Sequence, residues 1–180
     1  MLRYVHTLSL DENMQNKLFD LYEQSFPPFE CRTRDVHYQA VDDDRFYPMA
    51  VYNDDEFIGL LFYWLIDGIC YIEHLAIAAD SRGKGYGTLI LKDFCSLFNN
   101  IVLEIDPPID DVSIARERFY HHLGFITSKF DYIHPSYREE YIPHTLVLMK
   151  HKNDMAEDEF ERFKNIMFND IMKYSGKAKS

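Results

Sequence analysis

The sequence predicts an α/β protein built on one mixed β-sheet with helices on both faces. Its 180 residues, 47% of them hydrophobic and 27% charged, suit a single globular domain. Hairpin-linked strands in the first half are followed by strand–helix–strand crossovers, an order typical of a mixed sheet. Residues 57–66 are apolar on both sides of the predicted strand, so we expect helices to cover both faces of the sheet there.

Local signals set the bounds of the expected elements. Ser9 and Glu12 have the spacing of a helix-starting capping box, and the prolines after residue 26 end that helix. Asp67-Gly68, between two apolar runs, predicts a tight hairpin. The expected strands cover 2–9, 46–52, 57–66, 69–78, 101–105, 125–130 and 142–149. Five helices are expected: one begins at Ser9, the second spans 31–42, the third follows the glycines at 83–87, the fourth contains Ile114 to Leu123, and the fifth is capped by Asp154.

The chain divides by these elements into residues 1–150, the main domain, and residues 151–180, a helical extension whose tail frays from Gly176 onward. The extension carries an apolar stripe formed by Phe160, Phe163, Met167 and Ile171. This stripe must be buried, either against its own domain or in a dimer, so monomer and homodimer are both expected states.

Composition excludes several classes of function. The net charge of −11 argues against nucleic-acid binding and against an anionic membrane surface, because both depend on basic faces. The longest apolar run, residues 57–66, is too short for a membrane helix, and the N-terminus lacks the apolar stretch of a signal peptide. The three cysteines match neither zinc-site spacing nor a disulfide framework, so we expect a cytoplasmic protein without a metal site.

The most informative segment is Arg82-Gly83-Lys84-Gly85-Tyr86-Gly87, which joins a predicted buried strand to an amphipathic helix. Glycines permit close backbone approach, and the N–H groups at a helix start attract phosphate. The segment matches neither the P-loop nor the dinucleotide fingerprint in its spacing. Its glycine-rich turn predicts an anion cradle, and a turn without a ligand is the alternative.

Arg82, Gly85 and Gly87 also satisfy the pattern Arg/Gln-x-x-Gly-x-Gly/Ala. With the strand Leu75-Ala76-Ile77 before it and the segment from Phe119 to Phe125 after it, the chain resembles the GCN5-related N-acetyltransferases (GNAT) over about residues 2–150. The resemblance implies the GNAT fold, a mostly antiparallel mixed sheet with one splayed parallel strand pair, here 69–78 and 101–105.

The resemblance also implies acetyl-CoA as a co-substrate, held in the V between the splayed strands. Members of the family bond the pantetheine arm through the backbone of the first strand and the diphosphate through the glycine-rich turn. Many of them carry Asn at the position of Ser113, which weakens the assignment there. The implied cofactor-binding residues are Leu75, Ala76, Ile77, Arg82, Gly83, Lys84, Gly85, Tyr86, Gly87, Thr88 and Ser113.

Transfer to an amine requires a base that removes a proton from the ammonium and an acid that protonates the leaving thiolate. Tyr120 matches the general acid of the family, and a core tyrosine is the alternative. Glu73 is the expected base, because a lone carboxylate in an apolar strand, facing the same side as Leu75 and Ile77, should have a raised pKa. A salt-bridge partner is the alternative for Glu73.

By the same resemblance the acceptor pocket involves the loop after the first helix and the aromatic loop before the last strand. The candidate residues are Phe29, Glu30, Tyr132 and His134. They suit an amine-bearing acceptor, either a small molecule or a peptide. The expected function is N-acetyl transfer from acetyl-CoA to a primary amine in a ternary complex. A non-catalytic acyl-CoA-binding module and an interaction protein on the same fold are the alternatives.

Overall fold

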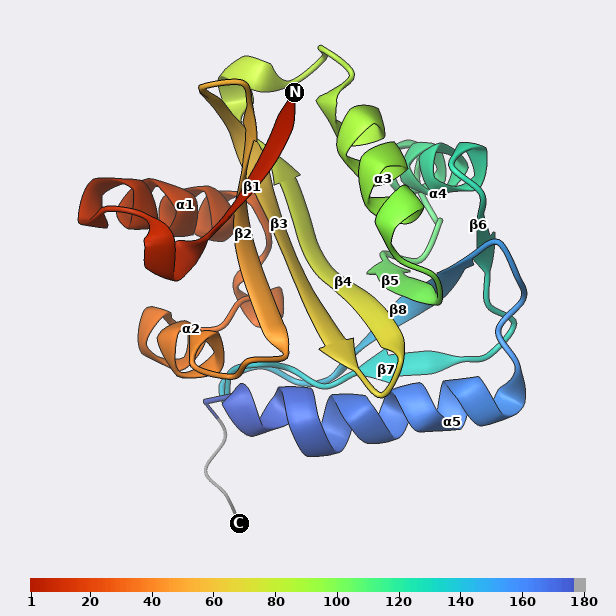
Figure 1. Ribbon diagram of the computed structural model, residues 1–180. Helices are drawn as coiled ribbons and strands as arrows, with labels where there is room; N and C mark the ends of the chain where they lie inside the picture. Colours follow the sequence, from red (N-terminus) through yellow and green to blue (C-terminus); the bar gives the residue numbers. More distant parts are fainter. Residues whose placement is uncertain (177–180) are drawn as a thin grey trace.

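The fold centres on an eight-stranded mixed sheet, seen in a computed structural model that describes residues 1–176 (Figure 1). Seven strands follow the order β1-β2-β3-β4-β5-β8-β6, and β7 pairs with β8. Among these strands β4 and β5 are parallel and the other pairs are antiparallel, which confirms the predicted sheet. The strands are β1 Leu2–His6, β2 Phe46–Asn53, β3 Glu56–Ile66, β4 Ile69–Ile77, β5 Ile101–Ile105, β6 Phe125–Thr127, β7 Tyr132–His134 and β8 His144–His151.

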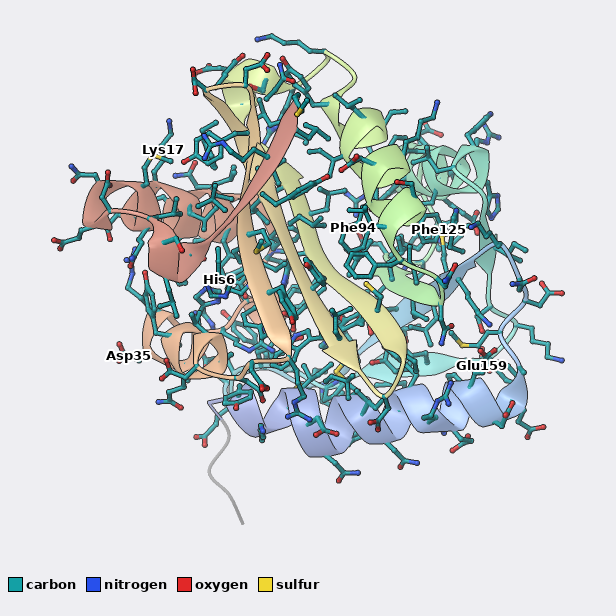
Figure 2. All side chains as sticks on the ribbon, in the orientation of Figure 1. His6, Lys17, Asp35, Phe94, Phe125 and Glu159 are labelled. Atoms are coloured by element: carbon teal, nitrogen blue, oxygen red, sulfur yellow. The ribbon has the colours of Figure 1, made fainter. Side chains whose placement is uncertain are left out.

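Helices cover both faces of the sheet, as predicted. The helices α1 (Glu12–Ser25), α2 (Arg34–Val41) and α5 (Glu157–Ile166) pack on one face, and α3 (Tyr86–Leu97) and α4 (Asp111–His122) pack on the other. In Figure 2, Phe94 of α3 lies between its helix and the sheet, whereas Lys17 and Asp35 lie on the outer surface. Strand β3 is buried on both faces over most of its length, which explains its continuous apolar sequence.

The parallel strands β4 and β5 separate after three paired residues. Their register runs from Cys70↔Ile101 to Ile72↔Leu103 and stops there, although β4 continues to Ile77 and β5 to Ile105. Beyond Ile72, in the part of the chain that the structure describes, this edge of β4 pairs with no other strand. The expected V between the two strands is therefore present.

A β-bulge in β4 changes where its side chains point. The register with β3 passes from Tyr63↔Ile72 to Phe62↔His74, which leaves Glu73 as the extra residue. Glu73 and His74 consequently both face the α1 and α2 side of the sheet, where His74 packs edge-on against Phe26. The prediction that Glu73 faces the same side of the sheet as Leu75 is wrong, because the extra residue of a bulge interrupts the alternation of side chains along the strand.

The last helix packs onto its own sheet. Its apolar stripe, the side chains Phe160, Phe163, Met167 and Ile171, is buried in the main core, and Phe163 contacts Tyr71 at a ring distance of 5.2 Å. The chain then continues through a π-helical turn and a 3-10 turn to Tyr174. Apart from Gly176 itself, the tail expected to fray lies outside the described residues.

Three helix starts differ from the sequence prediction, and one of them is α2, which begins at Arg34 rather than at residue 31. The first helix is capped by Asp11, whose carboxylate accepts from the Met14 amide, while Ser9 lies in a preceding 3-10 turn. The last helix begins after Ala156 rather than at Asp154. Neighbouring polar residues compete for a cap, and their tertiary contacts decide between them. None of the helices in residues 1–176 is long and apolar enough to cross a membrane.

Candidate active site

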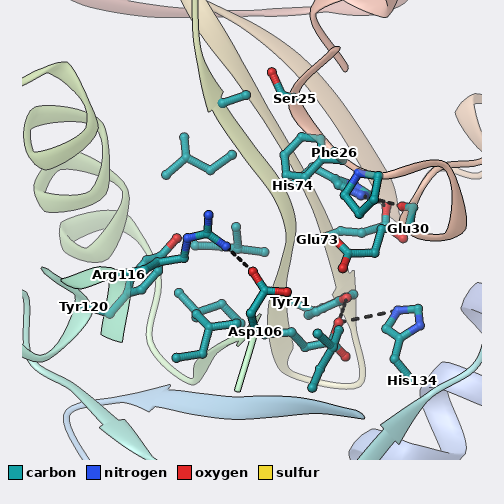
Figure 3. Close-up of a pocket in the computed structure, with 18 of the residues that line it drawn as sticks. Ser25, Phe26, Glu30, Tyr71, Glu73, His74, Asp106, Arg116, Tyr120 and His134 are labelled. Carbon is teal, nitrogen blue, oxygen red and sulfur yellow. Dashed lines mark hydrogen bonds and ion pairs between the residues drawn. The ribbon is translucent and has the colours of Figure 1, made fainter. Parts of the chain in front are cut away.

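A cavity of about 500 Å³ opens where β4 and β5 separate (Figure 3). Its size falls in the usual range for small-molecule sites. One side carries Glu30, Glu73 and His74, and the opposite side carries Arg116 and Tyr120 of α4. The backbone of β4, the far end of β5, the loop after α1 and the segment after β7 all contribute to the wall, so elements distant in sequence meet at one site.

The predicted anion cradle lies at one mouth of this cavity. Gly85 caps α3 with φ +79°, and Gly83 has φ +74°, backbone conformations that L side chains rarely adopt. No side chain caps the helix, so its first N–H groups are open to a ligand. Arg82 lines the cavity and donates from Nε to the carbonyl of Ile77 at 3.1 Å, which fixes the turn to the end of β4.

These residues fit the diphosphate and pantetheine parts of acyl-CoA. The uncapped start of a twelve-residue helix supplies N–H donors and a positive dipole end for a diphosphate. Leu75, Ala76 and Ile77 line the cavity on the unpaired edge of β4, where backbone groups can bond an extended chain. Lys84 is exposed and pairs with Glu56 at 3.8 Å, while Tyr86, Gly87 and Thr88 form the half-buried first turn of α3.

Ser113 lies elsewhere. Its hydroxyl accepts from the amides of Ile109 and Asp110 and donates to Asp110, in the capping box that starts α4. The side chain is buried and is absent from the cavity wall. The structure therefore gives Ser113 a capping role and shows no contact by which it reaches the V.

Glu73 lies in a closed network of hydrogen bonds and charge. Arg32 binds it through two hydrogen bonds of 2.8 and 2.9 Å, Trp64 donates from Nε1 at 3.2 Å, and the Tyr137 hydroxyl donates to Oε1. Burial alone would raise the pKa of Glu73, but the charge and hydrogen bonds of Arg32 outweigh it and hold the pKa well below its usual range. The predicted rise of this pKa toward neutrality is wrong, because no local sequence pattern marks Arg32 as a buried partner of Glu73.

Glu104 of β5 is a second carboxylate in the same cavity, and no lysine or arginine within residues 1–176 forms an ion pair with it. Its Oε2 accepts from the Tyr71 hydroxyl at 2.8 Å and lies 3.4 Å from Nε2 of His134, whereas Oε1 is buried without a partner in the described structure. Burial raises the pKa of Glu104 to about 8, although interactions with the hydroxyls of Tyr71 and Tyr132 lower it. A carboxylate with a pKa near physiological pH can accept and release a proton.

Tyr120 lines the cavity from α4, as expected for a group beside the leaving sulfur. Burial raises the pKa of its phenol to about 12, so the hydroxyl keeps its proton at neutral pH and can donate it. Arg116, one turn earlier on α4, forms an ion pair with Asp106 at the end of β5. This pair spans the gap between α4 and the open end of the V (Figure 3).

Two of the four predicted acceptor residues line the cavity. Glu30 and His134 belong to its wall. Tyr132 shares the buried face of β7 with His134, but it lies outside the cavity wall and packs under α5 against Phe160 and Phe163. Phe29 stands behind the wall and packs against His144 and Tyr141. For Phe29 the structure gives a packing role, whereas Tyr132 also interacts with Glu104 through its hydroxyl.

Sequence reasoning missed Arg32, Trp64 and Glu104, whereas Tyr137 belongs to the aromatic loop expected at the acceptor pocket. Glu104 was detectable, because it is a lone carboxylate in the apolar strand Ile-Val-Leu-Glu-Ile, the same signal that drew attention to Glu73. Arg32 was not, since its partner is 41 residues away and no local pattern marks the contact.

Comparisons with known proteins agree with this geometry. The family model described as "Acetyltransferase (GNAT) family" matches residues 15–125, more than half of the chain. Among curated proteins no significant relative was found. A structure described as a putative GNAT-family acetyltransferase from Bacteroides thetaiotaomicron is 28% identical, with a TM-score of 0.87 and 99% of each chain covered.

Two more distant structures share the fold. Arabidopsis thaliana Naa50 in complex with the bisubstrate analogue CoA-Ac-MVNAL is 20% identical, with a TM-score of 0.56 over 83% of this chain and 97% of the other. A GNAT family acetyltransferase from Elizabethkingia anophelis with acetyl-CoA bound is 15% identical, with a TM-score of 0.56 over 85% of this chain and 97% of the other. The chain belongs to the GNAT acetyltransferase family.

Proposed function

We propose that this acetyltransferase moves an acetyl group from acetyl-CoA to a primary amine by direct attack in a ternary complex, with Glu104 as base and Tyr120 as acid. The observation that carries the proposal is one cavity that joins three features: Arg82 in the turn that leads to the open start of α3, the unpaired edge of β4, and two proton-transfer groups on β5 and α4. Acetyl-CoA supplies an activated thioester, so a base and an acid complete the chemistry.

In this mechanism Glu104 accepts a proton from the acceptor ammonium. The free amine nitrogen then forms a bond to the acetyl carbon, and the bond between that carbon and sulfur breaks with its electron pair on sulfur. Backbone N–H groups near Ala76 and Ile77 polarise the carbonyl oxygen. Tyr120 donates a proton to the sulfur and recovers one from the new amide nitrogen through solvent. Glu104 releases its proton to solvent, so one proton is lost per transfer.

Glu73 has a different role in this proposal. Its oxygens are already occupied by Arg32, Trp64 and Tyr137, and its lowered pKa makes it a poor proton acceptor. We assign it to holding the cavity floor in shape. The base role expected from the sequence thereby passes from Glu73 to Glu104, which faces it across the V.

The test measures release of free CoA thiol with a panel of primary amines, together with Tyr120→Phe. We expect turnover by the natural chain and a loss of 10²- to 10⁴-fold in kcat for the variant, the usual contribution of a general acid. Calorimetry should give the same acetyl-CoA affinity for both proteins. Acetyl-CoA binding without turnover of any amine would instead support a non-catalytic acyl-CoA-binding module, and absence of acetyl-CoA binding would reject both.

A further inference from the structure

Only some of the carboxylates in the cavity wall are paired with a cation. Four carboxylates line it, those of Glu30, Glu73, Glu104 and Asp106. Glu73 is neutralised by Arg32, and Asp106 pairs with Arg116. In residues 1–176 no lysine or arginine lies within ion-pair distance of Glu30 or Glu104.

The basic side chains that do contact these two carboxylates are histidines, which are uncharged at neutral pH. His134 lies 3.4 Å from Glu104, and His144 lies 3.7 Å from Glu30. Burial lowers the pKa of each histidine to about 4. The two imidazole rings stack with their centres 5.4 Å apart, so two uncharged rings connect the surroundings of Glu104 with those of Glu30.

Both carboxylates are largely buried, and there a negative charge without a neighbouring cation is unfavourable in free energy. The side chain of Glu104 is 8% exposed and that of Glu30 is 19% exposed. Burial raises the pKa of Glu30 to about 7, and the charges of Asp106 and Glu104 add to this effect. Glu104 Oε1 and the hydroxyl of Ser25 are further buried oxygens of the wall without a partner in the described structure. A wall of this kind is complementary to more than one hydrogen-bonding cation.

We propose that the acceptor is a small amine with two ammonium groups, an α,ω-diamine or a polyamine, of which Glu104 receives the group to be acetylated and Glu30 the second. This inference rests on the proposed function. The same charges disfavour an amino-acid acceptor, because Arg32 and Arg116 are already paired with Glu73 and Asp106. Arg82, the other arginine of the wall, belongs to the turn that leads into α3 and donates to the Ile77 carbonyl. A free carboxylate on the acceptor would meet like charge without compensation.

The test compares three acceptors of matched length in the CoA-thiol assay: 1,4-diaminobutane, butylamine and 4-aminobutanoate. We expect kcat/KM for the diamine to exceed that for butylamine at least tenfold, with 4-aminobutanoate the poorest of the three. Glu30→Gln should reduce the ratio of diamine to butylamine at least fivefold. Glu23→Gln, an exposed carboxylate on α1 outside the cavity wall, is the matched control and should leave the ratio unchanged.

Calorimetry with CoA present gives a readout independent of turnover. Diaminobutane should bind more tightly than butylamine, and Glu30→Gln should remove the difference. Three outcomes would overturn the diamine proposal without contradicting the acetyltransferase reaction. They are equal kcat/KM for diamine and monoamine, a preference for 4-aminobutanoate, and an unaltered ratio of diamine to butylamine in Glu30→Gln. Turnover of none of the amines, with diaminobutane still bound in preference, would overturn the proposed reaction and keep the cation site.

Discussion

Arg32 and Glu73 form a two-point ion pair at the floor of the cavity, with side chains 0% and 1% exposed. The pair is enclosed by aromatic rings, since the Arg32 guanidinium lies 4.3 Å from the centre of the Tyr137 ring and 5.7 Å from that of Trp64. A fully buried pair of this kind contributes little net stability but makes each partner dependent on the other.

We therefore expect Arg32→Met to lower the free energy of unfolding by about 3–5 kcal/mol, because it leaves Glu73 buried without a counter-charge. Arg32→Met combined with Glu73→Gln should recover part of this loss, since the buried negative charge is then gone. Urea unfolding of the three variants and the natural chain measures both effects. A double variant no more stable than Arg32→Met would contradict the account.

Glu104→Gln tests the base directly. The base must be ionised in the free enzyme, so kcat/KM should rise as pH increases through about 8, the pKa to which burial raises Glu104. The variant keeps an oxygen that accepts from the Tyr71 hydroxyl, so we expect it to fold and to bind acetyl-CoA. Its kcat/KM should fall 10²- to 10⁴-fold and should no longer rise with pH. If Glu104→Gln retained the rise and Glu73→Gln removed it, the base would be Glu73.

Gly85→Ala should weaken binding of CoA at the start of α3. At φ +79° a methyl side chain costs about 1 kcal/mol, and relaxation of the turn would move the N–H groups that hold a diphosphate. Gly68, at φ +75° in the β3–β4 hairpin, is the matched control because both sites leave open space around a new Cβ. Both variants should lose similar stability in thermal melts. Only Gly85→Ala should lose CoA affinity by calorimetry, and equal affinities would reject the cradle.

Apart from the short strand β7, which was expected to be a loop, the order of elements was predictable because its signals are local, and the place of the V followed from the resemblance to the GNAT family. The Asp67-Gly68 hairpin is one example: both residues adopt positive φ, as the turn type requires. The direction of Glu73 was not predictable, because a bulge is set by the cross-strand register between Phe62 and His74. The site chemistry depended on this residue. One extra residue in β4, with an arginine brought from the loop before α2, turned an expected base into half of an ion pair.

The end of the chain completes the same floor, which yields the last prediction. The Tyr174 carbonyl accepts from Nε of Arg32 at 2.9 Å, its ring stacks 6.0 Å from Trp64, and the amide of Gly176 donates to the carbonyl of Tyr137 at 2.7 Å. Deletion of residues 172–180 would expose the Arg32–Glu73 pair to water and free Tyr137. Since the cradle at α3 lies at the opposite end of the cavity, we expect acetyl-CoA affinity to change less than twofold while KM for the amine rises at least tenfold. Deletion of residues 177–180 alone is the control, because it keeps all three contacts. Equal KM values for the two truncated chains would show that the C-terminal segment does not position the floor.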